Sequence, residues 1–279
     1  MTKIFNKSLI VILICVLFVL PVYSRVDRTS EEYLKNKKHL TPITPVVENF
    51  AQTVVKSALK KETGRNFKVK FAAYTLSSMR KGIFKSMEVY GNDVVIKGLN
   101  LSYVHLKTLT DYNWIDYRQN PPVFKSDINC AYEIGISESA LNTALDLPEY
   151  QEKLKKVNKK AYPLFAVNDV DVKVNDNKMK IIIVYNFPLT PEKKDRVFAV
   201  STNFFVKDGK IYARNISIEK KYGTVSMDKI KNLINLLNPL SYILDFMNPS
   251  NCNFKIENVN IVDDIIQIDG KILIKGEQK

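Results

Sequence analysis

The residue types that most often perform catalytic or metal chemistry are scarce in this chain. It has 279 residues, with two histidines, His39 and His105, and nine glycines. The two histidines lack the i, i+4 spacing with which a helix binds zinc. The sequence contains no G-x-S-x-G elbow, no Walker loop and no G-x-G-x-x-G motif. These patterns therefore predict neither a metal centre nor a phosphate-binding loop.

Carboxylates are the remaining candidates for acid–base chemistry. A pair can work as acid and base only when its separation and pKa values are matched. Four lie in the middle of the chain: Asp111, Asp116, Glu133 and Glu138. Their spacing does not single out two of them, so we predict no catalytic residue, no cofactor and no bound metal.

Two cysteines, Cys130 and Cys252, lie outside the apolar N-terminal run that contains Cys15. In an oxidising compartment a disulfide between them would close a long loop and constrain the unfolded chain. The alternative is two buried thiols. Because a disulfide needs a specific geometry, the sequence leaves both possibilities open.

Residues 1–24 have the pattern of an export signal. Lys3 and Lys7 precede an apolar run from Leu9 to Leu20, and Ser24 occupies the position before the expected cleavage site. The run is shorter than the roughly 20 apolar residues of a membrane-spanning helix. We therefore expect an exported protein, cleaved after Ser24, with an uncleaved N-terminal membrane anchor as the alternative.

The remaining chain is expected to comprise a polar linker, 25–44, and one domain, 45–279. The chain is basic, with 42 Lys and Arg against 29 Asp and Glu and a formal net charge of +13. Outside the cytoplasm we expect no nucleic-acid partner, and an anionic membrane surface becomes the expected polyanion.

A lysine-rich segment offers candidates for contacting a lipid headgroup. Lys153, Lys156 and Lys160 fall near one face of the helix expected at 148–160. A solvated basic face is the alternative interpretation of these three lysines.

Hydrophobic periodicity and turn residues predict alternating groups of helices and strands. Helices are expected at 45–62, 137–147, 148–160 and 226–247, the last one kinked at Pro239. Strands are expected at 66–75, 83–90, 94–97, 99–109, 127–136, 163–175, 178–187, 196–206, 210–218, 253–262, 264–268 and 271–275, with a loop at 110–126. Strands joined by hairpins imply antiparallel sheet, so we predict an α+β fold with helices packed on the sheet.

Several predicted strands are apolar on both faces, as in 181–184 (IIIV) and 197–200 (VFAV). One face can pack on helices, whereas the other needs a second layer, a membrane or a bound apolar ligand. A core covered by helices on both faces is one interpretation, and a cavity for acyl chains is the other. The candidate cavity residues are Phe50, Val54, Ile83, Met87, Ile181, Ile183, Phe198, Phe204, Leu233, Leu237 and Ile243.

Three segments resemble a known family. They are 82–89 (GIFKSMEV), 91–99 (GNDVVIKGL) and 136–142 (ISESALN). Together they resemble the LmeA-like phospholipid-binding family of bacterial envelopes, and the order of elements is similar over roughly 45–275. The resemblance implies a tubular lipid-binding (TULIP-like) fold, in which a curved antiparallel sheet wraps around long helices. It implies no catalytic residues.

We therefore expect an exported envelope protein that is not an enzyme and that binds phospholipid or a similar amphiphile, in lipid transfer or in support of envelope lipid metabolism. Two alternatives stay open. One is a non-enzymatic envelope scaffold or interaction protein, and the other is a hydrolase with an unrecognised site. The sequence does not predict the oligomeric state.

Overall fold

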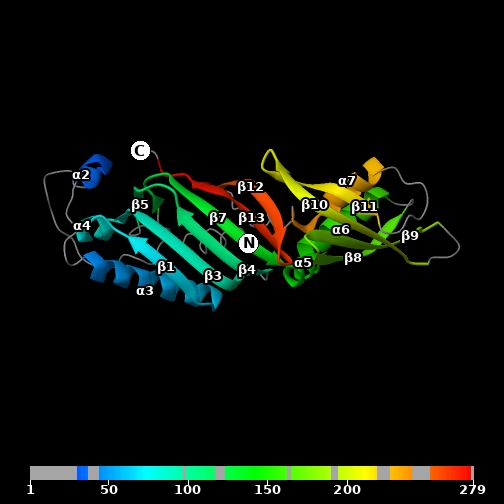
Figure 1. The fold of residues 1–279 in the computed structure, drawn as a ribbon, viewed down its shortest axis with the longest axis horizontal. Helices are drawn as coiled ribbons and strands as arrows, with labels where there is room; N and C mark the ends of the chain where they lie inside the picture. The colour runs from blue at the N-terminus through cyan, green and yellow to red at the C-terminus, as the bar shows by residue number, and fades with distance from the viewer. Residues whose placement is uncertain are drawn as a thin grey trace.

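The computed structural model describes residues 30–36, 44–96, 99–116, 123–161, 165–189, 194–218, 227–240 and 252–277. These residues form an elongated body in which two antiparallel sheets follow each other along the long axis (Figure 1). The predicted α+β class with antiparallel sheets is confirmed. Among the described residues, none of the helices has both the length and the apolar character needed to cross a membrane.

The main sheet has six strands in the order β1-β3-β4-β7-β13-β12. Their bounds are β1 Phe67–Ala72, β3 Ser86–Ile96, β4 Leu99–Thr108, β7 Ile128–Ser137, β13 Ile265–Ile274 and β12 Cys252–Val262. A small sheet at one end contains β2 Ile83–Phe84, β5 Asn113–Asp116 and β6 Val123–Phe124. The predicted loop at 110–126 therefore contains two short strands.

The second sheet has four strands in the order β11-β10-β9-β8. Their bounds are β8 Ala166–Asn175, β9 Lys178–Asn186, β10 Arg196–Lys207 and β11 Lys210–Ile218. The breaks expected between strands 163–175 and 178–187 and between strands 196–206 and 210–218 are confirmed as tight turns, since Asp176, Asn177, Asp208 and Gly209 have positive φ between 51° and 69°. β10 also lies against β12, which brings the two sheets together (Figure 1).

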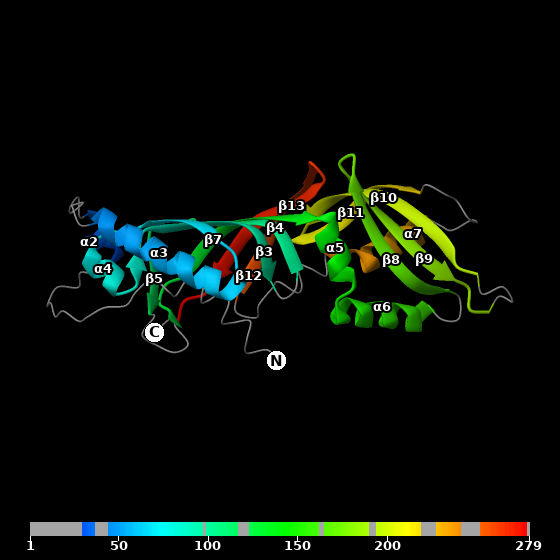
Figure 2. The same cartoon turned by 90° about the horizontal axis from the view of Figure 1, so that it is seen from below.

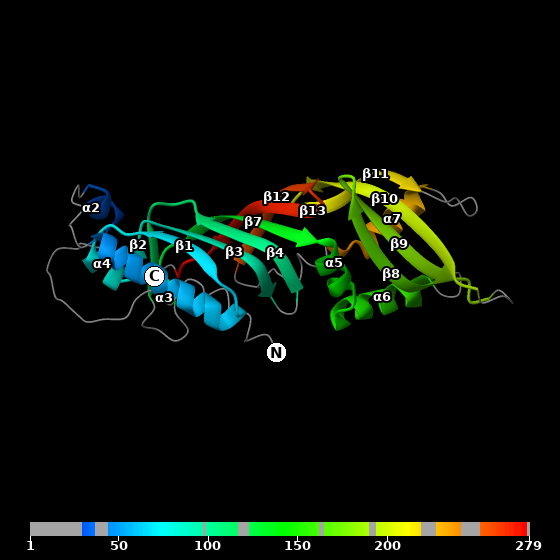
Figure 3. The same cartoon turned by 60° about the horizontal axis from the view of Figure 1, so that its bottom comes forward.

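The helices lie on one side of the two sheets (Figures 2 and 3). Their bounds are α2 Glu31–Asn36, α3 Thr44–Thr63, α4 Leu76–Arg80, α5 Glu138–Leu145, α6 Pro148–Ala161 and α7 Met227–Leu237. α3 packs on β1 and β3, α5 and α6 pack on β8, and α7 packs on β11. α2 falls within residues 25–44, so the expected polar linker is partly helical.

Ser137 joins the two sheets. It is the last residue of β7 and the N-cap of α5, where its hydroxyl accepts a hydrogen bond from the Ala140 amide at 3.3 Å. Serine favours this position because its side chain satisfies an amide that lacks a partner inside the helix. The chain therefore passes from the main sheet to the helices of the second sheet without an intervening loop.

The breaks expected between strands 83–90 and 94–97 and between strands 264–268 and 271–275 are wrong, because single strands continue through them. β3 runs through 91–93, with Asp93 at φ 51°, and β13 runs through Asp269-Gly270. Gly270 is needed for a close approach rather than a turn: a Cβ there would lie 2.0 Å from the Lys255 carbonyl oxygen on β12. A glycine inside a strand often marks such an approach of two backbones.

The long helix predicted at 226–247 is also interrupted. α7 ends at Leu237, and a new helical segment starts at Pro239. Asn238 between them is fully buried, and its side-chain oxygen accepts a hydrogen bond from the Leu240 amide at 3.1 Å. Asparagine followed by proline is a favourable start for a helix, so one helix ends here and another begins.

Asparagine side chains from two helices form hydrogen bonds with backbone amides and carbonyls on the outer edge of β8, the last strand of its sheet. Asn142 on α5 accepts from the Val172 amide at 2.9 Å and donates to the Val172 carbonyl at 3.0 Å. Asn158 on α6 makes the same pair of bonds with Val167, at 2.8 and 2.7 Å. An edge strand left open would offer these groups to another chain, so the two amides both attach the helices and close the edge.

Glu138 extends this closure towards the end of β8. Its carboxylate accepts from the Val174 amide at 2.9 Å and pairs with Lys173 at 3.1 Å. The Val174 hydrogen bond, followed by the Lys173 contact, lowers the pKa of Glu138 below its ordinary value. The ionised form of Glu138 therefore stabilises the attachment of α5 to β8.

We expect Asn142→Ala to lower the free energy of unfolding by about 1–3 kcal/mol, because it leaves the Val172 amide and carbonyl without partners. Asn142→Asp should also destabilise the protein, since a carboxylate cannot donate to the carbonyl. Urea unfolding followed by circular dichroism measures both. Asn260→Ala, at an exposed position on β12, is the control and should change stability by less than about 0.5 kcal/mol. Equal unfolding midpoints for Asn142→Ala and the control would contradict the proposed edge closure.

The pKa of Glu138 predicts a pH-dependent contribution. A lowered folded-state pKa adds stability above the unfolded value of about 4.3, and this stability is lost as the pH falls through the folded value. Glu138→Gln should therefore be less stable than wild type at pH 7, by at most about 1 kcal/mol because the side chain is partly exposed. Thermal melts from pH 7 down to pH 3 should show the difference disappearing. Glu152→Gln, at an exposed position on α6, is the control for removal of a surface carboxylate and should stay within about 0.5 kcal/mol of the wild type at pH 7.

Candidate functional site

The most extensive buried apolar surface of the main sheet lies on β7 and β13. We call the face that carries Val69 of β1 the inner face. It continues through directly opposed residues from Val69 to Val89, Leu106, Tyr132 and Gly270. On this face we define the β7–β13 strip as Ile128, Cys130, Tyr132, Ile134, Ile136, Ile266, Ile268, Ile272 and Ile274, each at most 6% exposed.

Of the described helices, α5 contacts β7, one of the two strands of this strip, whereas the principal contacts of the other helices lie on other strands. α3 buries Ala51, Val55 and Leu59 chiefly on β1 and β3, and α5 packs on β4, β7 and β8. Alternate residues along β7 and β13 are uniformly apolar except for one hydroxyl and one thiol. The strip is therefore an apolar part of the protein's buried core.

Tyr132 brings the hydroxyl into this apolar surface. Its side chain is 4% exposed, and its ring contacts Phe254 of β12 edge to face, with centroids 5.6 Å apart. The hydroxyl oxygen is buried and has no hydrogen-bond partner among the described residues. Burial raises the pKa of Tyr132, so it stays protonated and can donate. An unsatisfied buried hydroxyl costs about 1–3 kcal/mol, which a polar atom of a bound molecule would recover.

The strip also contains Cys130, and the disulfide considered from the sequence is not formed. Cys130 and Cys252 are both thiols. Cys130 lies opposite Ile272 and Cys252 opposite Ile274, so β13 separates the two cysteines. Two strand spacings of about 4.8 Å place their Cα atoms well beyond the roughly 7 Å limit for a disulfide. Burial raises the pKa of Cys130 to about 12 and that of Cys252 to about 11.

The candidate cavity residues predicted from the sequence do not form one surface. Met87 lies on the inner face of the main sheet, and Ile83 is buried in the small sheet. Six other candidates lie in the second sheet and α7. Four of them are buried, namely Ile181, Ile183, Phe204 and Leu237, and two are partly buried, namely Phe198 and Leu233. Val54 is half-buried, and Ile243 lies outside the described residues.

Phe50 is the clear exception, since it is 58% exposed. α3 is rotated relative to the predicted face: Ala51, Val55 and Leu59 point to the sheet, and Phe50 faces away. The sequence did contain a signal for the buried face of this helix, because Ala51, Val55 and Leu59 are spaced four residues apart. The sequence interpretation also missed Tyr132, although residues 128–136 alternate clearly between apolar and other side chains.

The headgroup candidates lie on α6. Leu154 and Val157 of this helix are buried, whereas Lys156 is exposed and Lys153 is half-buried. The side chain of Lys160 lies outside the described residues. The structure therefore places Lys156 on the solvent side of α6, away from the β7–β13 strip.

The candidate carboxylates serve different structural partners. Glu133 accepts a hydrogen bond from the Tyr103 hydroxyl at 2.7 Å on the outer face, and Glu138 closes the β8 edge. Asp111 pairs with Lys35 at 3.0 Å. Asp116 lies in β5. The described residues contain no group of three or more His, Cys, Asp or Glu that could hold a metal ion.

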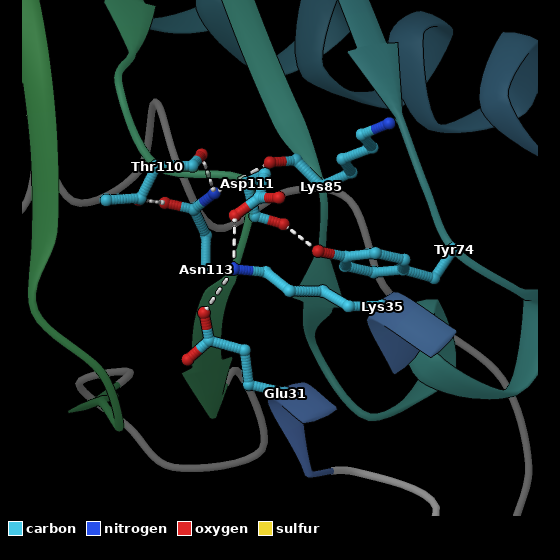
Figure 4. Close-up of polar contacts among 7 residues, drawn as sticks. All are labelled: Glu31, Lys35, Tyr74, Lys85, Thr110, Asp111 and Asn113. Carbon is cyan, nitrogen blue, oxygen red and sulfur yellow. Dashed lines mark hydrogen bonds and ion pairs between the residues drawn. The ribbon is translucent and has the colours of Figure 1, made fainter. Parts of the chain in front are cut away.

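Figure 4 shows the surroundings of Asp111, where α2 meets the end of the main sheet. Lys35 of α2 pairs with both Asp111 and Glu31, the latter at 2.7 Å, and the Tyr74 hydroxyl donates to the Asp111 carbonyl. Hydrogen bonds to these two carboxylates raise the pKa of Lys35. Nearby, the Asn113 amide donates to the carbonyls of Lys85 and Thr110, both at 3.0 Å. The cluster attaches α2 and the β4–β5 connection to the sheet.

Comparison of the chain with protein-family models, with curated proteins and with solved structures finds no match. The resemblance to the LmeA-like family therefore stays a prediction from the sequence.

The cysteine geometry predicts two slowly reacting thiols. When protein purified without reductant is unfolded, Cys130 and Cys252 should both still be thiols. A chromogenic disulfide reagent counts these thiols, and peptide mass spectrometry locates them. In the native state at pH 8 both should react much more slowly than after unfolding, because their raised pKa values keep them protonated. A peptide containing Cys130 joined to Cys252 would contradict the strand order.

Proposed function

We propose that this protein is an exported, non-enzymatic protein of the cell envelope that binds a phospholipid or a similar amphiphile. The acyl chains would lie against the β7–β13 strip, in a TULIP-like arrangement of curved sheet and helices. Lipid transfer or support of envelope lipid metabolism would follow from such binding. The N-terminal pattern of residues 1–24 supports export, and the resemblance of three segments supports the ligand class.

The observation that carries the proposal is the apolar strip with the Tyr132 hydroxyl in it. Nine residues of two neighbouring strands line one face, and eight of them offer no hydroxyl, amide or charge. Burying a methylene group contributes about 0.8 kcal/mol, so an acyl chain of a dozen or more carbons supplies substantial affinity. The Tyr132 hydroxyl would donate to an ester or hydroxyl oxygen of the same ligand and so recover its missing hydrogen bond.

An envelope interaction protein is the second candidate. The observation in its favour is the outer face of the second sheet, where Val197 is 50% exposed and Ile182, Val184 and Ala199 are half-buried. These four side chains are neighbours, because Val184 lies opposite Val197 and Ile182 opposite Ala199. Such a patch can pack against another protein.

The test is lipid extraction from the protein purified after export, followed by mass spectrometry. The expected result is close to one amphiphile per chain for the wild type. Tyr132→Phe should retain several-fold less lipid, because the ligand loses a hydrogen bond. The ligand-free form of the same variant should be more stable by up to about 1–3 kcal/mol, because a buried unsatisfied hydroxyl is removed.

Tyr103→Phe is the matched control, since its hydroxyl lies on the outer face and already donates to Glu133. This variant should retain wild-type lipid content. Absence of lipid in the wild type, together with no uptake of a fluorescent phospholipid, would exclude lipid binding. A pull-down of a defined envelope protein that Val197→Asp abolishes would then favour the interaction protein.

A further inference from the structure

The β9–β10 hairpin lies at one end of the long axis of the molecule and has an exposed apolar surface (Figure 2). Leu189, at the end of this hairpin, is 73% exposed. Close to it in the chain, the rings of Tyr185 and Phe187 contact edge to face, with centroids 5.5 Å apart. Transfer of such an exposed leucine from water into an apolar medium lowers the free energy. Aromatic rings that are partly in contact with water favour the boundary of such a medium.

Cations adjoin these apolar side chains. The Arg196 guanidinium lies over the Phe187 ring, 4.9 Å from its centroid, and Lys194 is exposed two residues earlier. Asp195, between the two cations, accepts a hydrogen bond from Asn168 of β8 at 2.5 Å. The stacking on Phe187 holds a positive charge beside the apolar tip.

α6 adds a second group of cations at the same end of the molecule (Figure 2). Lys155, Lys156 and Lys159 are exposed, whereas Leu154 and Val157 are buried. Residues 153–160 contain five lysines and no acidic residue. The helix therefore presents a basic surface away from the sheet that it covers.

We infer that this basic end, formed by Leu189, Lys194, Arg196 and the three α6 lysines, docks on the surface of an anionic lipid bilayer. Leu189 enters the interfacial region, and the cations meet the headgroups. Nucleic acid would be attracted by the lysines but would gain nothing from the exposed leucine. The inference assigns to Lys156 a contact with a bilayer rather than with a lipid held inside the protein. It does not depend on lipid binding at the β7–β13 strip.

Vesicle co-sedimentation with the full chain tests this inference. Vesicles of phosphatidylcholine are compared with vesicles that contain about 30% phosphatidylglycerol, which carry a negative surface potential. The protein should bind the anionic vesicles at least tenfold more tightly, and high salt should remove this preference. Leu189→Glu should weaken binding to anionic vesicles about tenfold. The combined change of Lys155, Lys156 and Lys159 to Glu should weaken it tenfold or more.

Two control variants carry the same chemical changes elsewhere. Leu109→Glu alters a leucine that is 48% exposed and lies directly after β4. Changing Lys178, Lys207 and Lys210 to Glu alters three exposed lysines at the opposite ends of the second-sheet strands. Both controls should bind within twofold of the wild type, and circular dichroism melts should show all variants folded.

Equal losses in the test and control variants, or binding without an anionic preference, would overturn the inference. Lipid extracted from the same preparations separates this result from the proposed function. A Leu189→Glu protein that keeps its bound lipid but loses vesicle binding supports docking at the basic end. A wild type that retains lipid but ignores anionic vesicles overturns the docking alone.

Discussion

The outer strands of two open sheets must satisfy their backbone amides and carbonyls, and helices that cover only the faces of a sheet cannot do this by packing alone. In this protein Glu138, Asn142 and Asn158 meet the requirement along β8. The same device recurs elsewhere. Asn235 of α7 accepts from the Ala213 amide of β11 at 3.1 Å, and Glu48 of α3 accepts from the Ala73 amide at 2.8 Å. These polar bonds set the positions of the helices, and apolar packing then fills the space between.

A consequence of this arrangement is that the helices are tied to particular strands and cover the sheets unequally. α3 is attached near β1, while α5, α6 and α7 are attached to the second sheet. Tyr150 of α6 strengthens the latter group, because its buried hydroxyl donates to the Leu237 carbonyl at the end of α7, at 2.7 Å. The β7–β13 strip lies between these two attachments. Its apolar surface and the Tyr132 hydroxyl are the features on which the proposed lipid site depends.

The sequence predicted most elements where local chemistry is decisive. Strong turn residues such as Asp208-Gly209 marked real hairpins, and Ser137 began a helix as expected. Glycine misled the interpretation at 91–93 and at Asp269-Gly270, because these positions allow close contact inside a continuous strand. At Gly91 a Cβ would lie 2.4 Å from the Phe67 ring, a contact between β3 and β1 that neither segment reveals alone. The face of α3 was also missed, since its contact with β1 decides which apolar stripe is buried.

By itself the sequence determined the class of the fold, the basic character, the scarcity of catalytic motifs and the alternation of apolar residues along the strands. These properties follow from residue types and short spacings. The tertiary structure decided which of the apolar surfaces lie together, because strand order places β13 between β7 and β12 and so separates Cys130 from Cys252. It likewise left the Tyr132 hydroxyl without a hydrogen-bond partner in the described part of the chain, and it brought α6 to the same end as the β9–β10 hairpin. Such neighbours are set by pairing between segments distant in the chain, which no local pattern encodes.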